Sequence, residues 1–190
     1  MTPVNDARRV REGIVFLVLF ALTIPAANWL IGHVGTACVE PYGPCVVPVA
    51  PGLMAPSGVT MIGFALVLRD LVQRRLGAVT SVIAIFCGAG LSALLAPLSL
   101  IVASGVAFLL SELADFLVYT PLSRRRLVVA VVASGLVGIV IDSIAFLWLA
   151  FGSLDFLLGQ VVGKGWMVLL SIPFISWLRR RDERFGIVPA

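Results

Sequence analysis

All thirteen arginines of this 190-residue chain fall in four short clusters, and long apolar stretches separate the clusters. The hydrocarbon core of a bilayer is about 30 Å thick, so a helix needs about 20 apolar residues to cross it. Each interval between clusters is long enough for two crossings. The pattern therefore predicts a membrane protein whose chain leaves and returns to the same side between clusters, which comprise Arg8, Arg9, Arg11; Arg69, Arg74, Arg75; Arg124, Arg125, Arg126; and Arg179, Arg180, Arg181, Arg184.

We expect one all-α domain over residues 1–190, a polytopic membrane protein with six transmembrane helices. Positively charged residues are retained on the cytoplasmic side during insertion, so both termini are predicted to be cytoplasmic and the chain to be a multi-pass protein of the cytoplasmic (inner) membrane. A cleavable signal peptide over residues 8–27 is the alternative for the first helix, but no small-x-small cleavage site precedes polar sequence there. The predicted spans are residues 14–31, 58–75, 79–96, 99–120, 127–150 and 157–178.

Composition supports this class and excludes others. The chain is 60% hydrophobic and 13% charged, with a mean hydropathy of +1.09, which excludes an ordinary water-soluble domain. The isoelectric point near 9.5 is typical of nucleic-acid binding as well, but here the arginines lie where lipid headgroups account for them. We therefore predict the lipid bilayer as a partner and no nucleic acid, and the sequence leaves a homo-oligomer open.

Residues 32–57 form the one long external loop that we predict, between helices one and two. Five prolines and several glycines in this segment disfavour a helix, and either a lid or a re-entrant hairpin fits the composition. Cys38 and Cys45 lie in this loop, in a compartment that tolerates disulfides. A disulfide between them and two free thiols both remain open.

Glu112, Asp115, Asp142 and Lys164 lie inside the predicted spans and away from the arginine clusters. Each costs about 2.5 to 3.5 kcal/mol at the centre of a membrane helix, so the default explanation is a polar interior site. Glu112, Asp115 and Tyr119 are spaced i, i+3, i+7 and share one helix face. An alternative for Asp115 alone is that it reaches Arg124 or the lipid headgroups.

Asp142 and Lys164 are predicted to lie at similar depth, about fifteen and fourteen residues from the cytoplasmic ends of their helices. A buried ion pair between them is the structural alternative to a role in binding, and the two roles are compatible. Further residues are candidates for the same cavity, although serines often bond their own helix and aromatic residues often face lipid or core. These candidates are Asn28, Phe64, Ser104, Phe108, Ser111, Ser143, Phe146, Gln160 and Trp166.

Several motifs in order across the six spans carry a family resemblance, from about residue 28 to residue 181. They are Pro56-Ser57-Gly58, the run from Phe64 to Asp70, the run from Ala103 to Asp115, Ile141-Asp142-Ser143, and Lys164 with Pro173-Phe174. Through them the chain resembles the queuosine precursor transporter family, also called the vitamin uptake transporter (VUT) family. The resemblance implies import of a 7-deazaguanine base in its cyano or aminomethyl form. A carboxylate such as Glu112 or Asp142 can accept two hydrogen bonds from the guanine-like edge of that base.

Our prediction is a secondary transporter in which Glu112, Asp115 and Asp142 recognise a small nucleobase-like substrate while Lys164 holds an acid in place. A vitamin-binding subunit of a multi-component importer is one alternative, but Ala21 to Ala26 lacks the Ala-x-x-x-Ala spacing by which such subunits dock. A membrane scaffold is another. The sequence offers no catalytic set within the spans, because its only histidine is His33 in the external region, so we predict no enzyme, no cofactor and no metal.

Overall fold

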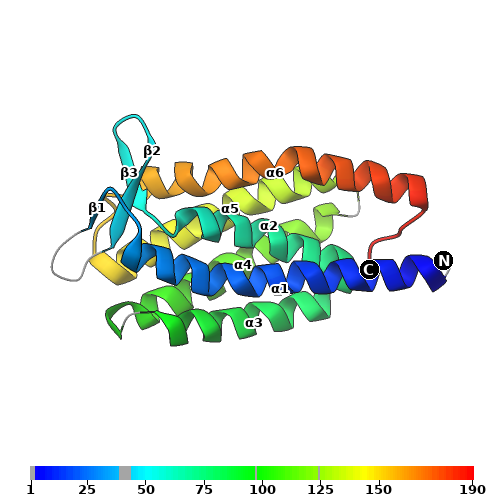
Figure 1. The fold of residues 1–190 in the computed structure, drawn as a ribbon, viewed down its shortest axis with the longest axis horizontal. Helices are drawn as coiled ribbons and strands as arrows, with labels where there is room; N and C mark the ends of the chain where they lie inside the picture. The colour runs from blue at the N-terminus through cyan, green and yellow to red at the C-terminus, as the bar shows by residue number, and fades with distance from the viewer. Residues whose placement is uncertain (1–2, 39–43, 97, 124) are drawn as a thin grey trace.

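The computed structural model describes residues 3–38, 44–96, 98–123 and 125–190, so Glu40, Pro41, Pro97 and Arg124 lie outside the described part. In this described part, six long helices run side by side in a bundle (Figure 1). Both chain termini lie at one end of the bundle, here called the terminal end, and a small sheet lies at the other, here called the sheet end. Each predicted span falls on one helix: α1 Pro3–His33, α2 Val59–Leu76, α3 Ala78–Leu95, α4 Ile101–Ser123, α5 Leu127–Phe151 and α6 Leu157–Phe185, with a short 3-10 turn, η1, at Leu98–Leu100.

Five of these helices are long and apolar enough to cross a membrane, namely α1, α3, α4, α5 and α6. Helix α2 is the exception, because Arg69, Asp70, Arg74 and Arg75 lie in its second half. It packs against all five other helices, and every residue from Ala65 to Arg75 is buried. A helix surrounded by protein needs no apolar face for lipid, which explains its composition. Its 18 residues correspond to about 27 Å, close to the thickness of the hydrocarbon core.

Two glycines mark where α2 and its neighbours approach most closely. A Cβ on Gly63 would lie against the backbone of Lys164 in α6, and a Cβ on Gly138 of α5 would lie 2.9 Å from Leu66 and 3.2 Å from Asp115. Small residues of this kind allow helix backbones to pack tightly inside a membrane. The close approach brings charged residues of α2, α4, α5 and α6 together near the bundle axis.

Within the described residues, the long segment predicted between the first two helices contains a three-stranded antiparallel sheet, which corrects the purely helical expectation. Its strands are β1 Ala37–Cys38, β2 Cys45–Ala50 and β3 Leu53–Pro56, in the order β1-β2-β3. The strands were missed because they are short and contain prolines. Beyond Val46, β2 pairs only with β3, so Pro48 interrupts no pairing with β1.

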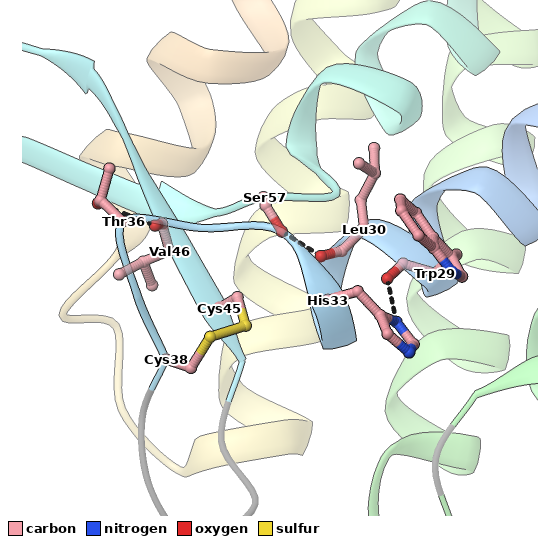
Figure 2. The surroundings of a disulfide bond; sticks show 8 residues. All are labelled: Trp29, Leu30, His33, Thr36, Cys38, Cys45, Val46 and Ser57. Carbon is pink, nitrogen blue, oxygen red and sulfur yellow. Dashed lines mark hydrogen bonds between the residues drawn. A yellow bond between two sulfur atoms is a disulfide. The ribbon is translucent and has the colours of Figure 1, made fainter.

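A disulfide joins Cys38 of β1 to Cys45 of β2, which resolves the open question about these thiols (Figure 2). The Ser57 hydroxyl donates to the Leu30 carbonyl at 2.7 Å and ties the end of the sheet to α1. The Trp166 indole donates to the Val49 carbonyl at 3.0 Å and ties β2 to α6. The sheet is therefore fastened to the first and the last helix.

Candidate functional site

A cavity lies in the half of the bundle nearest the sheet. Its empty space, with the open solvent at its mouth included, is about 780 Å³. All six helices contribute to it, mainly through their ends nearest the sheet. Its lining is mostly apolar, with a few polar side chains: Thr23, Asn28, Ser92, Ser104, Ser111, Glu112, Asp142 and Gln160.

Two aromatic residues and two carboxylates stand out in this lining. Phe108 of α4 and Phe146 of α5 contribute rings, while Glu112 and Asp142, from the same two helices, contribute carboxylates. Glu112 is 2% exposed and Asp142 is 5% exposed. Flat ligands with N–H donors at one edge fit such a lining, because rings pack against their faces and carboxylates accept from the donors.

Asp142 is held from behind by Lys164, as predicted for the ion pair. The Lys164 ammonium donates to Asp142 Oδ2 at 2.6 Å and to the Ser143 hydroxyl at 2.9 Å, and also contacts the Gln160 side-chain oxygen. The other carboxylate oxygen, Asp142 Oδ1, has only a long contact with the Ser111 hydroxyl at 3.4 Å. One oxygen of Asp142 is thus engaged by the protein and the other is available to a ligand.

A second buried cluster, here called the Arg69 centre, consists of Arg69, Asp70, Glu112 and Asp115. The Arg69 guanidinium donates to Glu112 Oε2 at 3.1 Å, lies 3.0 Å from Asp70 Oδ1 and also contacts Asp115. All four side chains are at most 2% exposed. Glu112 belongs both to this centre and to the cavity lining.

The terminal half of the bundle contains a third group of charges, here called the terminal cluster. Asp182 of α6 accepts from Arg74 and Arg75 of α2, with its shortest contact 2.8 Å from Arg75. Glu12 of α1 pairs with Arg75 at 3.1 Å and with Arg181 at 2.6 Å. These ion pairs join α1, α2 and α6 at the end where the chain begins and ends.

The structure brings most of the predicted site residues together. Asn28, Ser111, Glu112, Asp142 and Gln160 line the cavity, and Ser143 and Lys164 lie directly behind Asp142. The predicted stripe of Glu112, Asp115 and Tyr119 is confirmed as the buried face of α4.

Three expectations are corrected. Asp115 does not reach the headgroups, because it is completely buried against Arg69 and does not line the cavity. Phe64 packs against the main hydrophobic core and is not among the lining residues. Arg69 and Arg75 are fully buried, so the second arginine cluster is not simply a basic loop at the membrane boundary.

Sequence reasoning missed the central role of Arg69 and Asp70. A signal was present, because these two opposite charges follow directly on the apolar run Phe64 to Leu68, with no polar residue between. The proximity of Arg74 and Arg75 favoured a boundary instead. Within the described residues, no group of three or more histidine, cysteine, aspartate or glutamate side chains is arranged to hold a metal ion.

Comparison with known families bears on what this cavity does. Residues 91–178, somewhat less than half of the chain, match a family model described as "Putative vitamin uptake transporter". That match supports the vitamin uptake transporter family. It covers α4, α5 and most of α6, and therefore includes Glu112, Asp142 and Lys164. No curated protein and no solved structure gives a significant match. Together with five membrane-length helices, the match supports a multi-pass membrane transporter.

Proposed function

We propose that this protein imports a queuosine precursor, a 7-deazaguanine base in its cyano or aminomethyl form, across the cytoplasmic membrane. The observation that carries the proposal is the pair of carboxylates, Glu112 and Asp142, facing one largely apolar cavity that also contains two phenylalanine rings. The six helices would all span the membrane, with α2 enclosed by the others and both termini in the cytoplasm.

Recognition would depend chiefly on the carboxylates. Asp142 Oδ1, which has only the long contact with Ser111, and the Glu112 carboxylate accept the imino and exocyclic N–H groups of the base, and Phe108 and Phe146 pack against its faces. Asn28, Ser111 and Gln160 offer further polar contacts. Lys164 and Ser143 position Asp142 from behind, and Asp115, which contacts Arg69, does not itself touch the substrate.

Transport requires that the cavity be reached from each side in turn. The cavity occupies the half nearest the sheet, while ion pairs join the helices in the terminal half. Release on the cytoplasmic side would therefore require α1, α2 and α6 to separate around the terminal cluster.

The test is uptake of labelled 7-cyano-7-deazaguanine by cells that express the wild type or Asp142→Ala, compared at equal membrane abundance. We expect uptake to fall at least tenfold, because the variant loses a charge-assisted acceptor in the cavity, typically about 1.5 to 3 kcal/mol. Asp155→Ala is the matched control, since Asp155 is exposed and outside the cavity. Undiminished uptake by Asp142→Ala would remove Asp142 from the site.

A binding screen on the purified protein addresses the substrate itself. Guanine, the two deazaguanine precursors and common vitamins are compared by thermal shift, and we expect stabilisation by the deazaguanines. Stabilisation by a vitamin alone would overturn the proposed substrate. Transport by the purified chain in liposomes would exclude the multi-component alternative, whereas co-purification of an ATPase module would support it.

A further inference from the structure

The Arg69 centre contains more acidic than basic side chains, unlike the buried Asp142–Lys164 pair. Asp142 has one cation, Lys164, but Asp70, Glu112 and Asp115 share only Arg69. If all three acids were ionised, the centre would carry a formal charge of −2 in a volume from which water is almost excluded. Burying charge without a partner costs several kcal/mol per ion, so such groups are neutralised instead. A carboxyl group is neutralised by binding a proton.

The geometry indicates where a proton resides. Within the described residues, the Asp115 carboxyl lies within hydrogen-bond reach of the Asp70 carboxyl, and its other polar neighbours are the Ser134 hydroxyl and Arg69. Two carboxylates can only accept, so a hydrogen bond between them requires that one carry a proton. Asp70 Oδ2 already accepts from the Ser134 hydroxyl at 3.1 Å. The Tyr119 hydroxyl, on the same buried face of α4, has no hydrogen-bond partner among the described residues.

We propose that the Arg69 centre is a proton-binding site, with one exchangeable proton shared by Asp70 and Asp115, and that the movement of this proton drives transport through the adjacent cavity. This inference rests on the proposed transport function and adds its energy source. When the proton leaves, the carboxyl O–H bond breaks, the proton passes to water, and the new negative charge is balanced by the Arg69 guanidinium.

Glu112 connects the centre to the cavity. Its Oε2 accepts from Arg69 Nε at 3.1 Å while its side chain lines the cavity. While Asp70 and Asp115 hold the proton, Arg69 is free to keep Glu112 ionised and in place for a substrate that donates to it. When the proton leaves, Arg69 turns to the newly charged acid, the support of Glu112 is lost and the substrate is bound less tightly. Proton and substrate therefore favour each other's binding and are carried in the same direction.

A polar route leads from the centre towards the terminal end. Arg69 donates to the Gln73 side-chain oxygen at 3.1 Å, and Gln73 donates to the Thr120 hydroxyl at 2.9 Å. Both residues, with Tyr119, line a second cavity that also borders Pro189 and Ala190, and its empty space, open solvent included, is about 420 Å³. This second cavity provides space for water between the centre and the terminal end.

The other charged groups around the centre do not neutralise it. Arg74, the next cation on α2, is held by Asp182. On α5 the charge is Asp142, already paired with Lys164 of α6. Helix α3 has no charged residue, and Glu12 of α1 is paired in the terminal cluster. The excess of acid is therefore local to the Arg69 centre.

Infrared spectroscopy tests the proton without any substrate. We expect the purified wild type at neutral pH to show the carbonyl band of a protonated carboxylic acid, which shifts in D₂O and is lost in Asp115→Asn or in Asp70→Asn. Asp155→Asn, at an exposed site, is the control and keeps the band. Absence of the band in the wild type, or its persistence in both variants, would overturn the proposal. The wild-type spectrum decides even if a variant fails to fold.

Coupling is tested in liposomes with labelled 7-cyano-7-deazaguanine and an imposed pH gradient of one unit. One coupled proton accumulates the base about tenfold on the alkaline side, because a tenfold ratio of protons balances a tenfold ratio of substrate. Asp115→Asn is expected to equilibrate the base without accumulation. Wild-type uptake that does not depend on the pH gradient would overturn the proposed coupling of proton and substrate. No uptake under any condition would instead count against the proposed substrate, while the infrared result still decides on the proton.

Discussion

The two halves of the bundle use buried charge in opposite ways. In the half nearest the sheet, acids face a cavity, and Lys164 and Arg69 support them from behind. In the terminal half, arginines are in excess: Arg74, Arg75 and Arg181 surround Asp182 and Glu12. The pockets that Arg74 and Arg181 border have no acid among their described lining residues. Acceptors that face a cavity are suited to binding a ligand, whereas acids fully paired with arginines are suited to holding helices together. The difference indicates which half holds a solute and which half must open.

Breaking the Asp142–Lys164 pair should have the largest effect. Lys164→Met leaves a buried carboxylate without its cation, which costs about 3 to 5 kcal/mol of stability. We expect a large drop in melting temperature and in membrane abundance, measured on protein in detergent and in expressing cells.

The double variant Asp142→Asn with Lys164→Met separates stability from binding. It removes both charges, so most of the lost stability should return while uptake stays absent. If the double variant were as unstable as Lys164→Met alone, the loss of stability would not come from the unpaired charge of Asp142. Restored uptake would show that the cavity does not require the carboxylate.

The terminal cluster provides the corresponding test for the other half. Asp182→Asn weakens charge-assisted bonds from Arg74 and Arg75 and a longer one from Arg181, and should cost about 2 to 3 kcal/mol. Its neighbour is the matched control: Glu183 pairs with Arg179 on the surface, where such pairs contribute about 0 to 1 kcal/mol. Equal loss of stability in Asp182→Asn and Glu183→Gln, measured by thermal unfolding, would mean that the terminal cluster does not hold the helices together.

These charges also show what the sequence could and could not predict. The Asp142–Lys164 pair was predictable, because each residue is alone in an apolar window and the two windows place them at matching depth. The Arg69 centre was not, because its burial depends on five helices enclosing α2, and adjacent Arg74 and Arg75 suggested a membrane boundary. The sheet was missed for a similar reason: its short strands are stabilised by the disulfide and by contacts to α1 and α6.

The junction between the two halves depends on close packing at Gly138. A Cβ there would meet Leu66 and Asp115, so Gly138→Ala should overpack the bundle and cost about 1 to 3 kcal/mol. Gly90 is the control, because a Cβ at this helical position meets nothing within 4 Å. Gly90→Ala should instead stabilise the protein by about 0.5 to 1 kcal/mol through helix propensity. Thermal unfolding measures whether each variant is more or less stable than the wild type. A loss of stability in both variants would contradict the packing argument.

The smallest expected effect concerns how firmly the sheet closes its half of the bundle. Trp166→Phe removes the one hydrogen bond described between its indole and Val49, worth about 0.5 to 1.5 kcal/mol. Trp148→Phe makes the same change at an exposed position for which no indole hydrogen bond is described. Hydrogen exchange of the amides in β2 and β3 measures the result, and faster exchange is expected in Trp166→Phe only. Unchanged exchange would mean that Ser57, the disulfide and packing against α6 hold the sheet in place without this bond. The sheet would then be a fixed part of the half that contains the cavity, and breaking one contact would not release it.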